Sequence, residues 1–248
     1  QQSVMERKKS VEKKAIDKKS LQASVTESTN SLGLSEKIRI SILFVLHTVG
    51  LVGFSIDEYK PLFQLITPFH LIIITIVLLF EKSVLNINFL IFSLSAYLIG
   101  FFSEVFGVKS ALLFGYYSYS DWLGYKFLDV PLVLGVLWVS TAYACNQLAY
   151  SMVHGTVLRI IVASLFMVMF DYTIEPFAVS ANLWQWEMSV IPPYNYFSWF
   201  MVGIVLSIIY SYTVKNLSNK VSPYFIIVQV LFFLLYQLIN NGISLSPF

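Results

Sequence analysis

Two carboxylates stand four residues apart at the end of an apolar run, where Asp171 and Glu175 are followed at once by Pro176. Helical spacing places them on one face, close enough to couple. Two carboxyl groups that share a dry site cannot both ionise easily, so one should hold a proton. The pair predicts a proton donor and a proton acceptor on one helical turn. The structural alternative is that Asp171 hydrogen-bonds a neighbouring helix and Glu175 ends its helix before Pro176, which continues a helix poorly.

A third carboxylate, Glu104, follows another apolar run. We expect it either to join the pair or to be an ordinary carboxylate at a helix end near the membrane interface. His47 and His70 lie inside apolar runs and are expected to be packing residues, because no His, Asp and Glu set has the spacing of a metal site. Cys145 is the only cysteine, which excludes an internal disulfide and a cysteine-based zinc site.

The segments that carry these residues have the composition of membrane-spanning helices. The chain of 248 residues is 57% hydrophobic and 12% charged, whereas soluble domains are about 25% charged. Seven apolar runs have about the 17–25 residues that a bilayer requires. They are Ile40–Ile56, Leu62–Phe80, Val84–Phe102, Val130–Tyr150, Val157–Ile174, Tyr196–Val214 and Val221–Ile239. The sequence therefore predicts an all-α polytopic membrane bundle of about seven transmembrane helices, in which buried ionisable residues usually mark a function.

The N-terminal part differs from the rest of the chain. Residues 1–37 interleave Lys and Arg with acids and end in a Ser/Thr-rich stretch. We expect a basic, partly disordered cytoplasmic tail, followed by one transmembrane domain over residues 38–248. The Lys and Arg excess of this tail predicts a cytoplasmic N-terminus in a bacterial or archaeal inner membrane. The tail is also where a membrane-protein partner would dock, and no feature indicates nucleic acid as a partner.

The two longest connections are the third and the fifth, over residues 103–129 and 175–195, so they open on the same side. Both are rich in aromatic residues and hold most of the acids outside the tail. Val105–Tyr119 is too short and too polar at its ends to span a membrane, so we expect a re-entrant or interfacial helix there, folded against protein. The two connections together predict a pocket near the outer leaflet.

Several motifs follow one another along residues 104–203. They are Phe114-Gly115-Tyr116-Tyr117-Ser118-Tyr119, Val130-Pro131-Leu132 with Trp138, Asp171 through Val179, Trp184-Gln185-Trp186, and Ile191-Pro192-Pro193-Tyr194-Asn195-Tyr196 with Trp199. In this order they resemble the membrane-integral carotenoid 1,2-hydratases, the family that includes bisanhydrobacterioruberin hydratase. The chain departs from that pattern at Glu175, where the family has Asp, and at Asn182 and Ser198, where it has Gly.

The resemblance implies an enzyme of carotenoid biosynthesis that adds water across the terminal 1,2 double bond of an acyclic ψ-end. It implies no metal and no other cofactor. Its partners would be membrane lipid and an acyclic carotenoid or another long isoprenoid. The residues expected to be catalytic are Asp171, Glu175 and Glu104. The residues expected to bind substrate are Phe114, Tyr116, Tyr119, Trp138, Trp184, Trp186, Asn195 and Trp199.

Two other functions remain open. A carotenoid cyclase begins with the same protonation of a ψ-end, although the chain has no Pro-X-Glu-Glu motif of the kind that membrane lycopene cyclases carry. A non-catalytic, hydratase-like membrane subunit, or a scaffold that binds lipid or carotenoid in a complex, would keep the fold without the chemistry.

Overall fold

The computed structural model describes residues 32–80, 86–187, 190–214 and 218–241. The chain divides into two compact units, Gln1–Lys37 and Ile38–Phe248. Of the first unit, only residues 32–37 are described, so the basic tail predicted over residues 1–37 lies almost entirely outside the described residues. The features below belong to the second unit, except for residues 34–37, where the first described helix begins.

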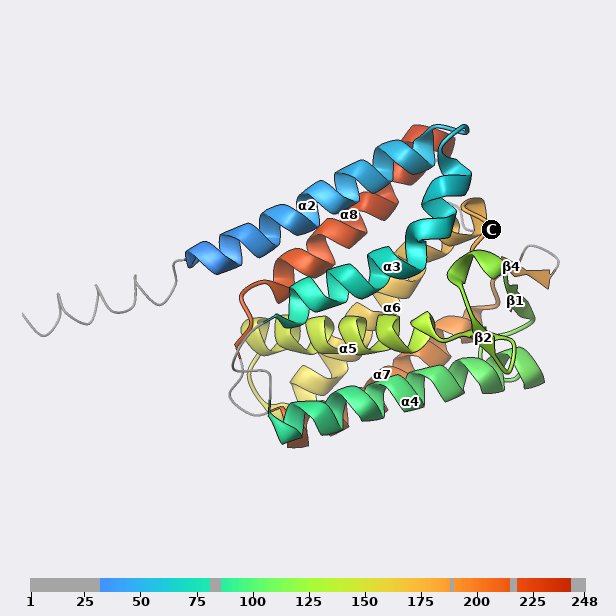
Figure 1. Cartoon of the computed structure of the whole chain (residues 1–248). Coiled ribbons are helices and arrows are strands. Elements are labelled where there is room, and N and C mark those ends of the chain that lie inside the picture. Colours follow the sequence, from blue (N-terminus) through green and yellow to red (C-terminus); the bar gives the residue numbers. More distant parts are fainter. Residues whose placement is uncertain (1–31, 81–85, 188–189, 215–217, 242–248) are drawn as a thin grey trace, which may run out of the picture. The chain divides into compact units, whose positions relative to one another are not determined.

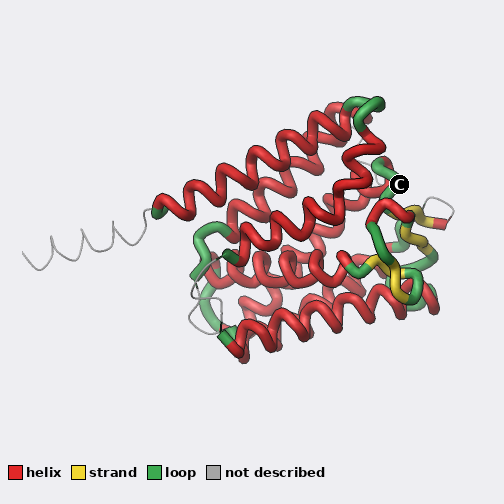
Figure 2. Tube along the Cα trace, in the orientation of Figure 1, coloured by secondary structure: helices red, strands yellow, loops and turns green. Residues whose placement is uncertain are grey.

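The described residues form seven α-helices, which confirms the predicted all-α bundle (Figure 1). They are α2 (Leu34–Ser55), α3 (Lys60–Leu79), α4 (Ile87–Ser110), α5 (Val133–Met152), α6 (Thr156–Ser180), α7 (Pro193–Thr213) and α8 (Ser222–Asn241). Short elements interrupt the connections that follow α4 and α6. They are the strands β1 (Tyr117–Tyr119), β2 (Lys126–Phe127), β3 (Val130–Pro131) and β4 (Trp184–Trp186) and the 3-10 helix η1 (Asp121–Leu123). Figure 2 shows that the strands gather at one end of the helices.

Six of the helices, all except α5, are long and apolar enough to cross a membrane, so the chain is an integral membrane protein. Helix α5 lies at the centre, where it contacts α3, α4, α6, α7 and α8. Protein rather than lipid surrounds it, so its polar side chains find partners on α7. Asn146 donates a hydrogen bond to Ser207 Oγ at 3.1 Å, and Gln147 donates to the Tyr210 hydroxyl at 2.7 Å.

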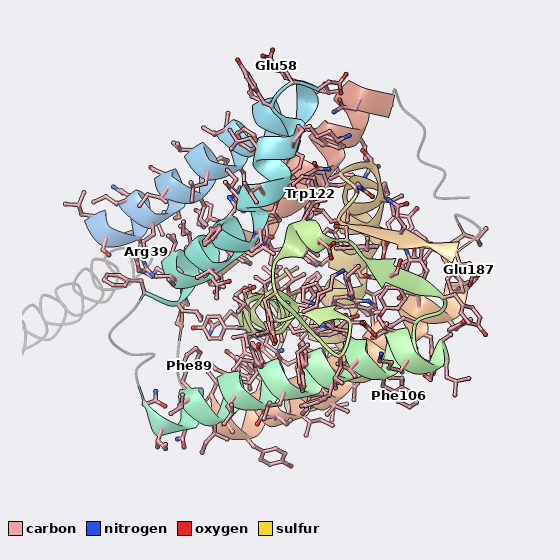
Figure 3. All side chains as sticks on the ribbon, turned by 45° about the vertical axis from the view of Figure 1, so that its right-hand side comes forward. Arg39, Glu58, Phe89, Phe106, Trp122 and Glu187 are labelled. Carbon is pink, nitrogen blue, oxygen red and sulfur yellow. The ribbon has the colours of Figure 1, made fainter. Side chains whose placement is uncertain are left out.

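The connections after α4 and α6 lie at the same end of the bundle. Figure 3 shows Arg39 and Phe89, near the starts of α2 and α4, at one end, and Glu187, just after β4, at the other. Strands β1 and β4 pair antiparallel and join these two connections directly. The ladder brings the side chains of Tyr117, Tyr119, Trp184 and Trp186 to a single site.

Two predicted boundaries and one predicted element are wrong. Helix α4 does not end near Phe102 but continues to Ser110, so Glu104 lies within the helix. It ends where Ala111 takes a left-handed conformation with φ 57°. No separate re-entrant or interfacial helix occupies Val105–Tyr119, because its first part extends α4 and its last part is strand β1.

Helix α6 continues past the boundary that the sequence predicts at Ile174. It runs through Pro176 and ends at Ser180. Proline lacks an N–H, so the helix gives up one backbone hydrogen bond there without ending. Its packing against α7 is close, because a Cβ on Gly203 would lie 3.2 Å from the Ser164 Cα. Small residues at such contacts let membrane helices approach closely.

Candidate functional site

The pairing of β1 with β4 sets four aromatic side chains on one face. The register aligns Tyr117 with Trp186 and Tyr119 with Trp184. Side chains two residues apart in a strand point to the same side. All four line one chamber inside the bundle, and their polar atoms reach two buried carboxylates.

Glu104 accepts three hydrogen bonds. Its Oε2 accepts from the hydroxyls of Tyr117 at 2.6 Å and Tyr119 at 2.7 Å, and its Oε1 accepts from Trp138 Nε1 at 3.0 Å. Burial, together with the nearby Glu104 carboxylate, raises the pKa of Tyr117 and of Tyr119 well above the ordinary value. Both tyrosines therefore keep their protons and remain hydrogen-bond donors to Glu104.

The carboxylate pair on α6 is less well supplied with donors. Glu175 Oε2 accepts from the indole Nε1 atoms of Trp184 at 2.9 Å and Trp186 at 2.8 Å. One turn earlier, Asp171 Oδ2 accepts from Asn195 Nδ2 at 2.7 Å. Among the hydrogen bonds of the described residues, the three carboxyl groups thus accept three, two and one. Asp171 is the group whose charged form receives the least direct support.

These groups enclose a chamber of about 30 Å³. A water needs about 10–15 Å³ on this measure, so the chamber has room for about two waters. Trp138 and Trp199 stack on one wall with ring centroids 4.0 Å apart. The predicted site residues that line the chamber are Glu104, Phe114, Tyr119, Trp138, Asp171, Glu175, Trp184, Trp186, Asn195 and Trp199. Within the described residues, no group of three or more His, Cys, Asp or Glu side chains is arranged to hold a metal ion.

Tyr116 is the one predicted site residue that does not line the chamber. Its side chain is 66% exposed and is absent from the lining of the chamber, while the neighbouring Tyr117 takes that place. The sequence analysis also missed three apolar lining residues, Leu134, Leu137 and Ile174. The signal for Tyr117 was its spacing of two from Tyr119, which in a strand puts both on one face.

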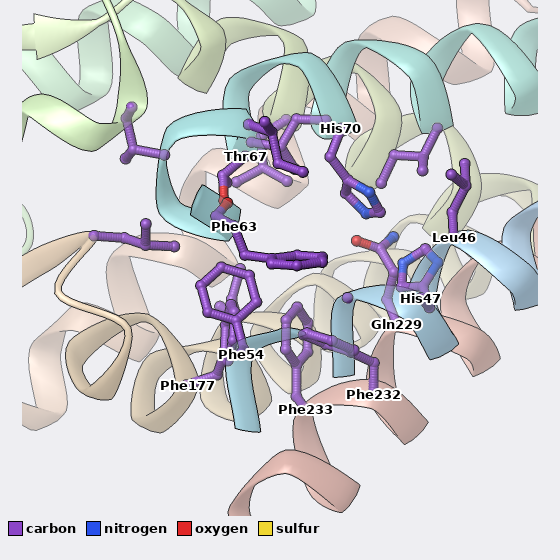
Figure 4. A pocket seen from close by; sticks show the side chains of 18 of the residues that line it. Leu46, His47, Phe54, Phe63, Thr67, His70, Phe177, Gln229, Phe232 and Phe233 are labelled. Carbon is purple, nitrogen blue, oxygen red and sulfur yellow. The ribbon is translucent and has the colours of Figure 1, made fainter. Parts of the chain in front are cut away.

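An apolar cavity of about 130 Å³ adjoins the chamber. Five phenylalanines, Phe54, Phe63, Phe177, Phe232 and Phe233, form much of its wall (Figure 4). The two spaces share four wall residues, which are Leu134, Leu137, Ile174 and Trp184. These four residues therefore form a common wall between the apolar cavity and the chamber that holds the carboxylates.

Replacing Glu104 with Ala is expected to destabilise the fold strongly. The change leaves the buried donors of Tyr117, Tyr119 and Trp138 without their acceptor, at about 1–3 kcal/mol for each unsatisfied group. Glu104→Gln keeps an acceptor oxygen and should lose much less. Thermal unfolding in detergent measures both variants, and equal melting temperatures for Glu104→Ala and wild type would show that these bonds contribute nothing.

Among the comparisons with known proteins, one with protein families finds a match. No curated protein and no solved structure matches the chain. A family model described as carotenoid biosynthesis protein matches residues 63–246, which include α4 to α7 and every residue of the chamber. A match over this share of the chain shows that the protein belongs to the family of carotenoid biosynthesis proteins.

Proposed function

We propose that this chain is a hydratase that adds water across the terminal 1,2 double bond of an acyclic carotenoid ψ-end. The observation that carries the proposal is the unequal carboxyl pair. Asp171 and Glu175 face one small aromatic chamber, with different hydrogen-bond support, beside an apolar cavity that suits a hydrocarbon end.

In the first step, Asp171 is the acid. Asp171 accepts fewer hydrogen bonds than the other two carboxyl groups. Its charged form is therefore the least stabilised, and it is the group that most readily holds a proton. The proton passes to C2 of the terminal alkene. The π electrons form the new C–H bond, and C1 becomes a tertiary carbocation. Asp171 is left as a carboxylate, which is a favourable charge beside the cation.

The chamber supports that cation in two ways. Its aromatic faces, above all the Trp138 and Trp199 stack, stabilise a cation by about 2 kcal/mol in a desolvated site. Three donors favour the charged form of Glu104, and an ionised Glu104 places a negative charge on the chamber wall. It acts on the reaction through its charge and by orienting Tyr117, Tyr119 and Trp138, rather than by transferring a proton.

Water completes the reaction with Glu175 as the base. Both indole donors reach Oε2 of Glu175, so Oε1 is the oxygen that accepts from a water in the chamber. The water oxygen bonds to C1, and Glu175 takes the released proton. Transfer of a proton from Glu175 to Asp171 restores the starting state. The net change is the alkene plus one water, giving a tertiary alcohol.

We also propose that the N-terminus lies in the cytoplasm. The tail is rich in Lys and Arg, and such residues accumulate on the cytoplasmic side of membranes. In this orientation the chamber lies toward the outer leaflet, and water reaches it from that side.

The test is expression in a host that makes lycopene, with pigments analysed by mass. Wild-type protein should yield pigments heavier by one or two waters. Glu187→Gln is a matched control, because Glu187 is an exposed carboxylate next to β4 that lines neither space, and it should behave as wild type. Unchanged lycopene in cells that contain folded protein would favour the non-catalytic subunit, and a product of unchanged mass with ring ends would favour the cyclase.

A further inference from the structure

Among the described residues that line the chamber, Asn195 is the only amide. It lies in the first turn of α7, where its backbone N–H donates to the Pro192 carbonyl oxygen at 2.9 Å, and the residue is 1% exposed. Trp199 follows one turn later on the same face of the helix and stacks on Trp138. The amide is therefore fixed on a well-packed wall of the chamber.

The fold uses only one end of this amide. Its Nδ2 donates to Asp171 Oδ2 at 2.7 Å, whereas its Oδ1 accepts no hydrogen bond from any described residue. Unlike the enclosed and unpartnered Thr141 Oγ1, this oxygen keeps accessible surface, and the residue lines the chamber. The same holds for Glu175 Oε1, because both indole donors use Oε2. The chamber thus has a free amide oxygen and a free carboxyl oxygen.

Two free acceptors are what a nucleophilic water needs. When both of its hydrogens are held by acceptors, a lone pair is left to attack a carbon atom. The chamber has room for about two waters, so a water inside it lies close to both oxygens. An amide oxygen accepts a hydrogen bond without taking the proton, which leaves Glu175 as the base.

We infer that Asn195 Oδ1 holds the attacking water together with Glu175 Oε1, and so determines whether the carbocation captures water or loses a proton. The inference rests on the proposed function, which supplies the cation. Capture gives the alcohol. Without capture, a C–H bond next to C1 breaks, its electron pair forms a C=C bond, and the Asp171 carboxylate takes the proton. This second path regenerates an alkene and the acid without consuming water.

Both fates can be counted in one experiment with the purified chain in detergent, lycopene and heavy water, sampled early in the reaction. Every protonation delivers deuterium to C2. A captured cation leaves carbon-bound deuterium in the alcohol, and a cation that loses a hydrogen leaves it in the recovered alkene. Mass spectrometry gives the ratio of deuterated alcohol to deuterated alkene. This ratio does not depend on how fast the cation forms.

Wild type should give mainly the alcohol. Asn195→Leu should still deliver deuterium, but its ratio of alcohol to alkene should fall at least about fivefold, as the loss of one net hydrogen bond to the water implies. Asn195→Asp keeps an acceptor oxygen, so its ratio should stay near that of wild type even if its turnover falls. Asp171→Asn should leave no deuterium in either compound. Asn240→Leu makes the same change on α8, outside the chamber, and should not alter the ratio.

The ratio separates this role from a structural one, and melting temperatures establish that the variants are folded. A wild-type ratio in Asn195→Leu would overturn the inference, and so would a ratio in Asn195→Asp as low as in Asn195→Leu. Parallel loss of both deuterated compounds in folded Asn195→Leu would also overturn it, because a merely structural contact to Asp171 predicts that result. Failure of the proposed function is different, since wild type would then form no alcohol at all, and both proposals would fall.

Discussion

Water addition is expected to stop in Asp171→Asn and in Glu175→Gln, although both proteins should still fold and reach the membrane. Each amide keeps the shape of the acid but cannot cycle a proton. General acid–base catalysis contributes about 10²–10⁴-fold to a rate, so each loss should be at least about 100-fold. Hydrated pigment in the lycopene-producing host, normalised to the amount of protein in the membrane, measures both variants.

Stability separates loss of chemistry from loss of fold in these variants. Gln at position 175 still offers an oxygen to the indoles of Trp184 and Trp186, and a neutral amide avoids the cost of a buried charge. The melting temperature should therefore equal or exceed that of wild type. Glu187→Gln provides the matched change outside the chamber. Full activity in both Asp171→Asn and Glu175→Gln would remove the pair from the mechanism.

The second prediction concerns the isotopes that the product takes up from labelled water. In heavy water, the product should carry solvent deuterium on C2, the carbon next to the alcohol carbon, because an exchangeable carboxyl group delivers the proton. In water enriched in oxygen-18, the new hydroxyl group should carry the label, because a chamber water captures the cation. Mass spectrometry of the purified pigment reads both labels, and nearly every product molecule should contain them.

The same labels separate the competing reactions. A cyclase would introduce the solvent deuterium but no oxygen, because a double bond of the chain captures the cation. Oxygen that arrives from molecular oxygen instead would rule out the acid–base mechanism and point to a redox enzyme. Product that the same protein forms in ordinary water provides the reference mass.

Much of the helical bundle could be predicted, because each helix is an apolar run and the order of the connections decides which of them meet. The errors come from contacts between residues distant in the sequence. Hydropathy ends the third span near Phe102, yet α4 continues to Ser110, since Tyr117, Tyr119 and Trp138 satisfy the Glu104 carboxylate. These partners are separated from Glu104 by 13 to 34 positions, which no local pattern reveals.

The chamber could be predicted in composition but not in detail. The acids and most of the aromatic residues were apparent from their clustering in two connections on one side. The choice between Tyr116 and Tyr117 depended on the backbone, and the expectation of a helix there hid the alternation of a strand. The pairing of β1 with β4 is a tertiary contact, and such contacts decide the conformation of short segments more strongly than local propensity does.

The ladder between β1 and β4 also restricts how the length of the chain can vary in related proteins. A slip of one residue in either strand would turn its inward side chains to the opposite face. A slip in β1 would withdraw both tyrosines from Glu104, and a slip in β4 would withdraw both tryptophans from Glu175. Single insertions and deletions should therefore be excluded between positions 117 and 119 and between 184 and 186, whereas exchanges of side chain remain open. Evolution can retune this site by substitution, but it cannot change the length of either strand by one residue without dismantling half of the site.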